Sequence, residues 1–278
     1  MKLYVLVDNN TLIDRYFKAE PGVSYYIKEE NVNILFDVGY SEIFIENAKK
    51  MKLDLYNIDY LVISHGHLDH TWGLIPYIKL LTEASIEEIS YKDTEFVSHP
   101  LALKDKMIDE DDIGTLVKEK KIEKHFNKNL TKKPYWLTDK LVFLGQIERN
   151  NDFEGECAIG TYECEGTFKK DYILDDSALV YKAKKGLVII TGCSHSGICN
   201  IIEYAKKVCN EEKILDVIGG FHLLNPNDYQ LNNTIKYFDS LDVKNIHACH
   251  CTDLKSKIEL SKVVNLNEVG VGLTLSYD

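Results

Sequence analysis

Short apolar runs separated by polar turns divide the start of the chain into strands. Met1–Val7 is apolar and is closed by Asp8, which is typical of a first strand. The runs Gly22–Ile27 and Asn31–Asp37 follow, with polar residues between them, and predict a β-hairpin. After this hairpin the apolar positions recur every three to four residues, so the period changes from that of a strand to that of a helix.

The remainder of the chain alternates between these two periods. Helices are expected after Ser41, which would cap the first of them, from Leu74, after Pro100, after Ser196 as a second cap, and from Asp228 and Asp253. Further strands are expected over residues 60–63, 95–98, 141–147, 177–183, 186–191, 214–218 and 245–249, with a last strand near Val269.

This order of elements predicts an α/β fold in which two sheets pack face to face with helices outside, an αββα four-layer sandwich. Each half of the chain begins with strands and then alternates strand and helix. A doubly wound parallel sheet is the alternative, but the N-terminal hairpin fits it poorly. The 278 residues are interpreted as one domain, residues 1–278. The charged stretch at 83–133 matches no motif and is expected as an insertion or lid.

Composition narrows the class of protein. The hydrophobic share of 45% supports a sizeable core, and 44 acidic against 33 basic residues give a net charge of −11. This charge argues against a nucleic-acid groove. No apolar run approaches the ~18–20 residues that span a bilayer, and the N-terminal run is too short for a signal peptide. We therefore expect a cytoplasmic protein without membrane contact, whose seven cysteines are thiols rather than disulfides.

The strongest candidate chemistry lies in the stretch Ser64–His70, directly after an apolar run. His65 and His67 would project to the same side of an extended chain, because side-chain direction repeats every two residues. Asp69 and His70 come after the turn and can face a second point nearby. Three imidazoles are hard to bury without a cation, so the spacing predicts one or two adjacent metal ions.

Three later histidines also follow predicted strands. His195 lies in a glycine-flanked turn, His222 follows two glycines, and His250 stands between Cys249 and Cys251. Glycine lets the backbone approach a ligand closely. A helix-capping role is the plainer alternative for His195. His125 and His247 have no such context and are expected to be structural.

Sulfur and carboxylate groups lie beside these histidines. Cys193, Cys249 and Cys251 would favour zinc or iron over magnesium if they bound metal, although small residues are also needed for packing under such a site. Asp176, in an Asp pair before a strand, is a candidate additional ligand. A turn or a solvated cap is the alternative for that pair.

The pattern H-x-H-x-D-H, formed by His65, His67, Asp69 and His70, resembles the signature of the metallo-β-lactamase-fold superfamily. Within it, the chain is similar to the branch described as 7,8-dihydropterin-6-methyl-4-(β-D-ribofuranosyl)aminobenzene-5′-phosphate synthase and its relatives. The segments that carry this similarity are Gly22–Ile27, Ile34–Gly39, Thr191–His195, Gly219–Leu223 and His250–Thr252.

The resemblance implies the αββα sandwich and two ligand sets. His65, His67 and His195 would hold one metal, and Asp69, His70 and His250 the second. Most of the superfamily places an aspartate between the metals, in a Gly-Asp pair after a strand. This chain has Gly192-Cys193 at the position that looks equivalent, so Asp176, or no bridging residue, would complete the second site.

The resemblance also implies an activity. A metal pair can hold a hydroxide, which Asp69 would orient, and can clamp the oxygens of a phosphate. The substrate is expected to be a small phosphate- or pyrophosphate-bearing molecule, with His222 touching it. The named branch joins a pterin pyrophosphate to an arylamine ribotide and releases pyrophosphate, which makes it a transferase rather than a hydrolase.

Other functions fit the same machinery. A generic phosphodiesterase or lactonase is one alternative, because the fold alone does not choose among substrates. An iron-bearing redox or sensor protein is another, suggested by the cysteines. Zinc is the first expectation for the metal, with iron or manganese as alternatives, and a homo-oligomer is left open.

Overall fold

A computed structural model describes residues 1–278 and contains two large sheets and one small sheet. The first large sheet has seven strands in the order β17-β1-β2-β3-β4-β5-β8. Its first part is an antiparallel meander, whereas β3, β4, β5 and β8 run parallel. The strands are β1 Lys2–Val7, β2 Ser24–Glu29, β3 Val32–Phe36, β4 Tyr60–Val62, β5 Glu95–Ser98, β8 Asn127–Leu130 and β17 Thr274–Ser276.

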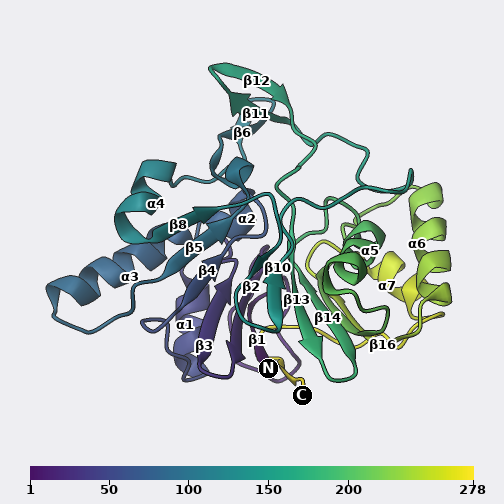
Figure 1. Ribbon diagram of the computed structural model, residues 1–278, viewed down its shortest axis with the longest axis horizontal. Coiled ribbons are helices and arrows are strands. Elements are labelled where there is room, and N and C mark those ends of the chain that lie inside the picture. Colours follow the sequence, from purple (N-terminus) through teal and green to yellow (C-terminus); the bar gives the residue numbers. More distant parts are fainter.

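Helices cover the outer face of this sheet, on the left in Figure 1. They are α1 Ile43–Lys50, α3 Leu74–Ile86 and α4 Glu119–His125, with the short helix α2 Leu68–Thr71 at the site described below. The apolar stripe of α3 is buried against the sheet, as its period predicted. The helix expected after Pro100 is a single 3₁₀ turn, η1 Pro100–Leu103.

The second large sheet has six strands in the order β16-β15-β14-β13-β10-β9. β13 and β14 form a hairpin, and β14, β15 and β16 run parallel. The strands are β9 Tyr135–Trp136, β10 Leu141–Phe143, β13 Ala178–Ala183, β14 Gly186–Thr191, β15 Ile214–Gly220 and β16 Val243–Cys249. The outer helices α5 Ile198–Cys209, α6 Asp228–Ser240 and α7 Leu254–Leu260 cover it on the right in Figure 1.

A layer of buried apolar side chains joins the two large sheets. Tyr25 and Phe36 from the first sheet belong to the same cluster as Val188 and Ile190 from the second. One further apolar cluster lies under the helices of each outer layer. The predicted αββα four-layer sandwich is therefore confirmed.

A small four-stranded sheet stands apart from the sandwich, at the top of Figure 1. It joins β6 Lys106–Ile108 and β7 Asp111–Asp112 to the hairpin β11 Thr161–Cys164 and β12 Thr167–Lys170. The stretch 83–133, expected as an insertion or lid, is thus divided: its strands β5 and β8 belong to the first large sheet, with β8 at the edge. Only its middle part, β6 and β7, joins the small sheet, where β6 pairs with β11 from later in the chain.

Other expected boundaries shift slightly. The last strand is β17, which pairs with β1 and so brings the two chain ends together, while only Val271 near the expected position forms a bridge. The N-cap of α1 is Glu42 rather than Ser41, and that of α5 is Gly197 rather than Ser196. Such differences of one residue are normal at helix ends. No helix is both long and apolar enough to cross a bilayer.

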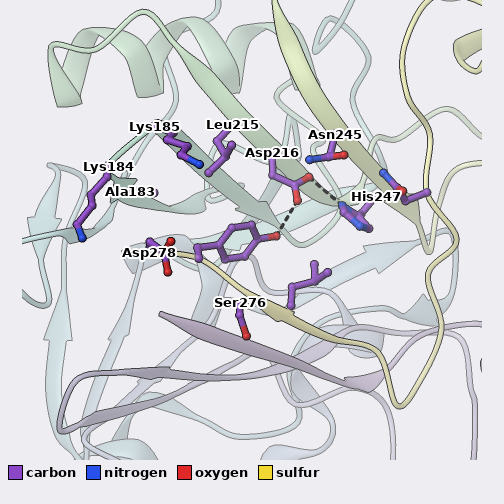
Figure 2. Close-up of a pocket in the computed structure, with 12 residues that line it drawn as sticks. Ala183, Lys184, Lys185, Leu215, Asp216, Asn245, His247, Ser276 and Asp278 are labelled. Atoms are coloured by element: carbon purple, nitrogen blue, oxygen red, sulfur yellow. Dashed lines mark hydrogen bonds and ion pairs between the residues drawn. The ribbon is translucent and has the colours of Figure 1, made fainter.

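A cavity of about 380 Å³ lies near the starts of β15 and β16, where the C-terminal residues pack (Figure 2). Figure 2 shows His247 beside Asp216, and the distance from His247 Nδ1 to Asp216 Oδ1 is 2.8 Å. Tyr277 Oη donates to Asp216 Oδ2 at 2.7 Å. Burial and this carboxylate raise the pKa of Tyr277, so its hydroxyl remains a donor. His247 is thus a structural partner of Asp216. The same carboxylate binds Tyr277 and so ties the C-terminal residues to the sheet.

Replacing Tyr277 with phenylalanine is expected to lower the free energy of unfolding by about 1–3 kcal/mol, because it removes a donor from a buried carboxylate. Urea denaturation measures the change. Tyr229→Phe is the matched control, since it breaks a Tyr–Asp hydrogen bond of 3.1 Å at an exposed position and should cost less than about 0.5 kcal/mol. Equal losses in the two variants would contradict the role given to Tyr277.

Candidate metal centre

The turn after β4 presents two imidazoles, and the turn after β14 adds a third. His65 Nε2 lies 3.1 Å from His67 Nδ1. The ring centroid of His195 lies 4.7 Å from that of His65 and 4.8 Å from that of His67. One ring nitrogen of each histidine lies within 4.8 Å of the others. The structure thus brings together the first predicted ligand set.

The second predicted set also converges. His250, at the end of β16, places its Nε2 3.2 Å from Asp69 Oδ2, and His70 Nε2 lies 3.7 Å from the same oxygen. These three side chains again offer ligand atoms within 4.8 Å of one another. The rings of His65 and His70 are 4.2 Å apart, so the two sets are adjacent. The role of these six residues as ligands stays a prediction.

Unpaired buried nitrogens test whether a cation fits. The nitrogens without any hydrogen-bond partner include His67 Nε2, His70 Nε2 and both ring nitrogens of His195. Burying a polar atom without a partner is costly, and native structures rarely contain several in one place. Divalent cations at the two predicted positions would each bind one ring nitrogen from these histidines, and imidazole with carboxylate suits zinc, iron or manganese. The donor set therefore fits a metal centre.

The protonation states agree with this. Burial, together with the neighbouring histidines, holds the pKa of His65 and of His195 well below the usual range, and burial beside Lys106 lowers that of His67 to about 4. These imidazoles are therefore neutral, which is the ligand form. Burial would also lower the pKa of His70, but Asp69 and Asp37 outweigh it and raise that pKa to about 9. Metal binding at His70 would displace a proton.

Asp37, at the end of β3, supports the cluster from behind. Its carboxylate accepts hydrogen bonds of 2.7 Å each from the backbone and hydroxyl of Ser64 and from His70 Nδ1. The Ser64 hydroxyl also lies 3.0 Å from His65 Nδ1. These bonds leave the Nε2 atoms of both histidines facing the site, a common arrangement around metals. Sequence reasoning missed this role, although an acid at the end of a buried strand was a usable signal.

His250 is oriented in the same way by the end of β1. Its backbone N–H donates to Asp8 Oδ1 at 2.9 Å, and its Nδ1 lies 2.9 Å from Asn9 Oδ1. The residue adopts φ 48°, a conformation that only a few per cent of non-glycine residues show. The two bonds hold the backbone in this conformation and aim Nε2 at Asp69.

A buried ion cluster fixes the turn between His65 and His67. Lys106 Nζ lies 2.5 Å from Asp171 Oδ2 and 2.9 Å from Asp175 Oδ1, and all three side chains are buried. Asp175 Oδ2 accepts the Gly66 N–H at 2.8 Å. Burial would lower the pKa of Lys106, but the two carboxylates raise it. No local pattern in the sequence marks this lysine, which sits in a charged stretch.

Asp176 lies outside the groups of ligand-spaced side chains, and its role as an additional ligand stays a prediction. Its Oδ2 accepts the Ser196 backbone N–H at 2.8 Å and so holds the turn that carries His195. It is absent from every set of ligand-spaced side chains. Burial raises its pKa to about 6, against the opposing effect of the Ser196 hydrogen bonds. The plainer alternative, a carboxylate that stabilises a turn, describes its position.

His222, expected to contact the substrate, lies directly beside the predicted ligand His195. Its ring centroid is 4.3 Å from that of His195, and its Nδ1 is buried without a partner. It also forms a ligand-spaced set with Cys193 and His195. Burial would lower its pKa, but Cys251 and Asp176 raise it. The position suits contact either with a metal or with a bound substrate.

A cavity of about 480 Å³ opens beside the ligands, within the range of small-molecule sites. It is lined by predicted ligands and by a set of apolar side chains, which we call the apolar wall. No lysine or arginine lines it. The apolar wall consists of Leu68, Ile108, Ile113, Ile159 and Leu224, contributed in part by the small sheet.

Comparisons with known proteins agree with this geometry. Residues 18–109 match the pattern of the Metallo-beta-lactamase superfamily. An uncharacterised protein of Methanocaldococcus jannaschii is 34% identical over 266 residues, which is 94% of each chain. The 7,8-dihydropterin-6-methyl-4-(beta-D-ribofuranosyl)-aminobenzene-5'-phosphate synthase of the same organism is 33% identical over 271 residues, 92% of this chain and 89% of that one.

Solved structures give the same picture. The crystal structure of Tm1679, a metal-dependent hydrolase of the beta-lactamase superfamily, is similar over 100% of both chains with a TM-score of 0.83 and 28% identity. The metallo-beta-lactamase fold protein YhfI from Bacillus subtilis superposes over 99% of both chains with a TM-score of 0.58 at 12% identity, which shows a shared fold.

Proposed function

The chain belongs to the metallo-β-lactamase superfamily, and from this membership we propose that it is a metal-dependent transferase or hydrolase acting on a phosphate- or pyrophosphate-bearing small molecule. The substrate we infer is pterin-related: a dihydropterin pyrophosphate that condenses with an arylamine ribotide and releases pyrophosphate. The similarity to the M. jannaschii synthase, over nine-tenths of the chain, supports this choice.

One observation supports it most strongly, which is the composition of the cavity. An anionic substrate must be neutralised where it binds, and the lining contains no lysine or arginine. The only groups that can do this are the predicted metal ligands with their ions, and His222. The apolar wall in the same cavity suits a flat organic group such as a pterin or an arylamine.

The residues then have distinct roles. His65, His67 and His195 would hold one ion, and Asp69, His70 and His250 the other. Bound ions would supply Lewis-acid stabilisation of the phosphate oxygens. Asp69, whose pKa is lowered below the usual range because His70 and His250 outweigh its burial, stays ionised to orient a reacting water or nucleophile. His222 would steady the negative charge of the departing pyrophosphate.

The test is a pair of assays on the metal-loaded protein. With the dihydropterin pyrophosphate and the arylamine ribotide together, we expect stoichiometric pyrophosphate and a condensed product seen by mass spectrometry. Pyrophosphate released at the same rate without the arylamine would indicate a hydrolase instead. Turnover of simple phosphodiesters or lactones at higher kcat/KM than the pterin would contradict the proposal.

An iron-bearing redox or sensor protein is the second candidate, and one feature favours it. Cys193 and Cys251 lie within the ligand groups, and sulfur suits iron. Stoichiometric iron and visible absorbance in the purified protein, without turnover of any phosphorylated substrate, would favour this function over the enzyme.

The apolar wall gives a prediction of its own. Replacing Ile108 or Ile159 with alanine is expected to raise KM for the pterin substrate about ten-fold, because each loses roughly 1–2 kcal/mol of apolar contact. Steady-state kinetics measure this change, and kcat is expected to stay within about a factor of three of the wild-type value. Ile86→Ala, at an exposed position on α3, is the matched control and should leave KM unchanged. A fall in kcat with constant KM would exclude a binding role for the wall.

A further inference from the structure

Two cysteines lie inside the metal centre but belong to neither predicted ligand set. Cys193 follows β14 and Cys251 follows β16, and their sulfur atoms are 3.1 Å apart. Cys193 is buried, and the Cys251 sulfur also accepts the His222 backbone N–H at 3.3 Å. The five other cysteines do not occur in any ligand-spaced group.

Cys193 occupies the point that the two halves of the centre share. Its sulfur lies within 4.8 Å of the ligand nitrogens of His65 and His70, which belong to different predicted sets. It forms a second group with His195 and His222, and a third with His250 and Cys251. A single thiolate at this point can therefore reach an ion on either side.

The surrounding atoms leave this space open toward the sulfurs. A Cβ atom on Gly220 would lie 2.5 Å from the Cys251 sulfur, so the glycine makes room for that thiol. Both ring nitrogens of the buried His195 lack a hydrogen-bond partner, and one of them lies within 4.8 Å of the Cys193 sulfur. Buried nitrogens without partners are rare in native structures, so their presence beside the sulfur indicates a ligand rather than packing alone.

We propose that Cys193 and Cys251 are metal ligands, with the Cys193 thiolate shared between the two ion positions and the Cys251 thiolate added to the position held by Asp69, His70 and His250. The centre then contains sulfur as well as nitrogen and oxygen. Thiolate ligands select zinc, iron or cobalt over magnesium and calcium. The proposal rests on the metal centre of the proposed function but not on its pterin substrate.

Spectroscopy of the wild-type protein tests the proposal without any turnover. In zinc-loaded, fully reduced protein, X-ray absorption should show a sulfur shell at about 2.3 Å in addition to the nitrogen and oxygen shell. In the cobalt-substituted protein, a thiolate-to-cobalt charge-transfer band should appear in the near ultraviolet. A first shell of nitrogen and oxygen alone would overturn the proposal even if the enzyme condensed its substrates normally.

Variants then assign the sulfur atoms. Cys193→Ser and Cys251→Ser should each weaken the charge-transfer band, and each should lower cobalt affinity by at least about 10–100-fold, the range for removing even an outer partner of a metal ligand. Cys249→Ser is the matched control, because Cys249 is buried in the same segment but its sulfur lies 3.4 Å from the Tyr25 hydroxyl. An unchanged band and affinity in both test variants would overturn the assignment.

Thiol counting covers the case in which a variant fails to fold. Under reducing conditions the wild-type protein has seven free thiols. Zinc should protect Cys193 and Cys251 from alkylation, as mapped by peptide mass, while exposed Cys157 reacts at the same rate with and without zinc. Equal alkylation of Cys193 and Cys251 in the zinc-loaded and metal-free proteins would contradict the proposal.

Discussion

Replacing His65 with alanine is expected to lower kcat/KM by about 10³-fold or more, because a bound ion contributes several kcal/mol to the stabilisation of a phosphoryl transition state. His65 is completely buried, and its ring lies within 5 Å of the rings of His67, His70 and His195. It therefore adjoins both predicted ion positions, and its loss should affect both. Metal content should fall in parallel.

The measurement combines elemental analysis with kinetics on the same preparation. His125→Ala is the control, since His125 lies on α4 and belongs to no ligand-spaced group. It should retain full metal content and turnover. A His65→Ala protein with normal rates and two ions would show that catalysis does not use this centre.

Replacing Lys106 with methionine is expected to cost about 3–5 kcal/mol of the free energy of unfolding, because it leaves the carboxylates of Asp171 and Asp175 buried without their cation. Methionine keeps most of the volume, so the loss reports charge rather than packing. Asp175 also accepts the Gly66 N–H, and the turn between His65 and His67 should loosen. Metal affinity is expected to fall together with stability.

Chemical denaturation with and without zinc separates the two effects. Lys118→Met is the matched control: Lys118 pairs with Asp105 at the surface, where both side chains are largely exposed, and such pairs contribute about 0–1 kcal/mol. If Lys106→Met does not fold, Asp171→Asn removes only one of the two charges and should lose about 1–3 kcal/mol. Equal stability of the Lys106 and Lys118 variants would contradict the role of the ion cluster.

The sequence predicted the fold, and the structure brings the residues of the two predicted ligand sets close together, for a specific reason. His65, His67, Asp69 and His70 lie within six residues, so the local backbone after one strand already brings them together. His195 and His250 follow strands that are parallel neighbours of β15, and the carboxyl ends of parallel strands share an edge. The order of strands and helices, from which the layers follow, is likewise predicted by the periods of neighbouring apolar residues.

The structure added contacts that depend on residues distant in the chain. Asp176, a candidate additional ligand, accepts a hydrogen bond from the Ser196 turn, and Asp37, not expected near the site, holds both Ser64 and His70. Both are acids beside strand ends, and the sequence does not distinguish them. Which carboxylate faces the ions depends on the register and twist of the sheets.

The sequence by itself determined that this protein presents clustered imidazoles at the edge of an α/β sandwich, because strand periods and a six-residue motif are properties of neighbouring residues. Only the tertiary structure decided what surrounds them. Lys106 meets Asp175 across 69 positions of the chain, and Cys193 meets Cys251 across 58. No local pattern encodes such distances, since they arise when whole sheets pack and bury charges and thiols that the sequence shows only as scattered polar residues.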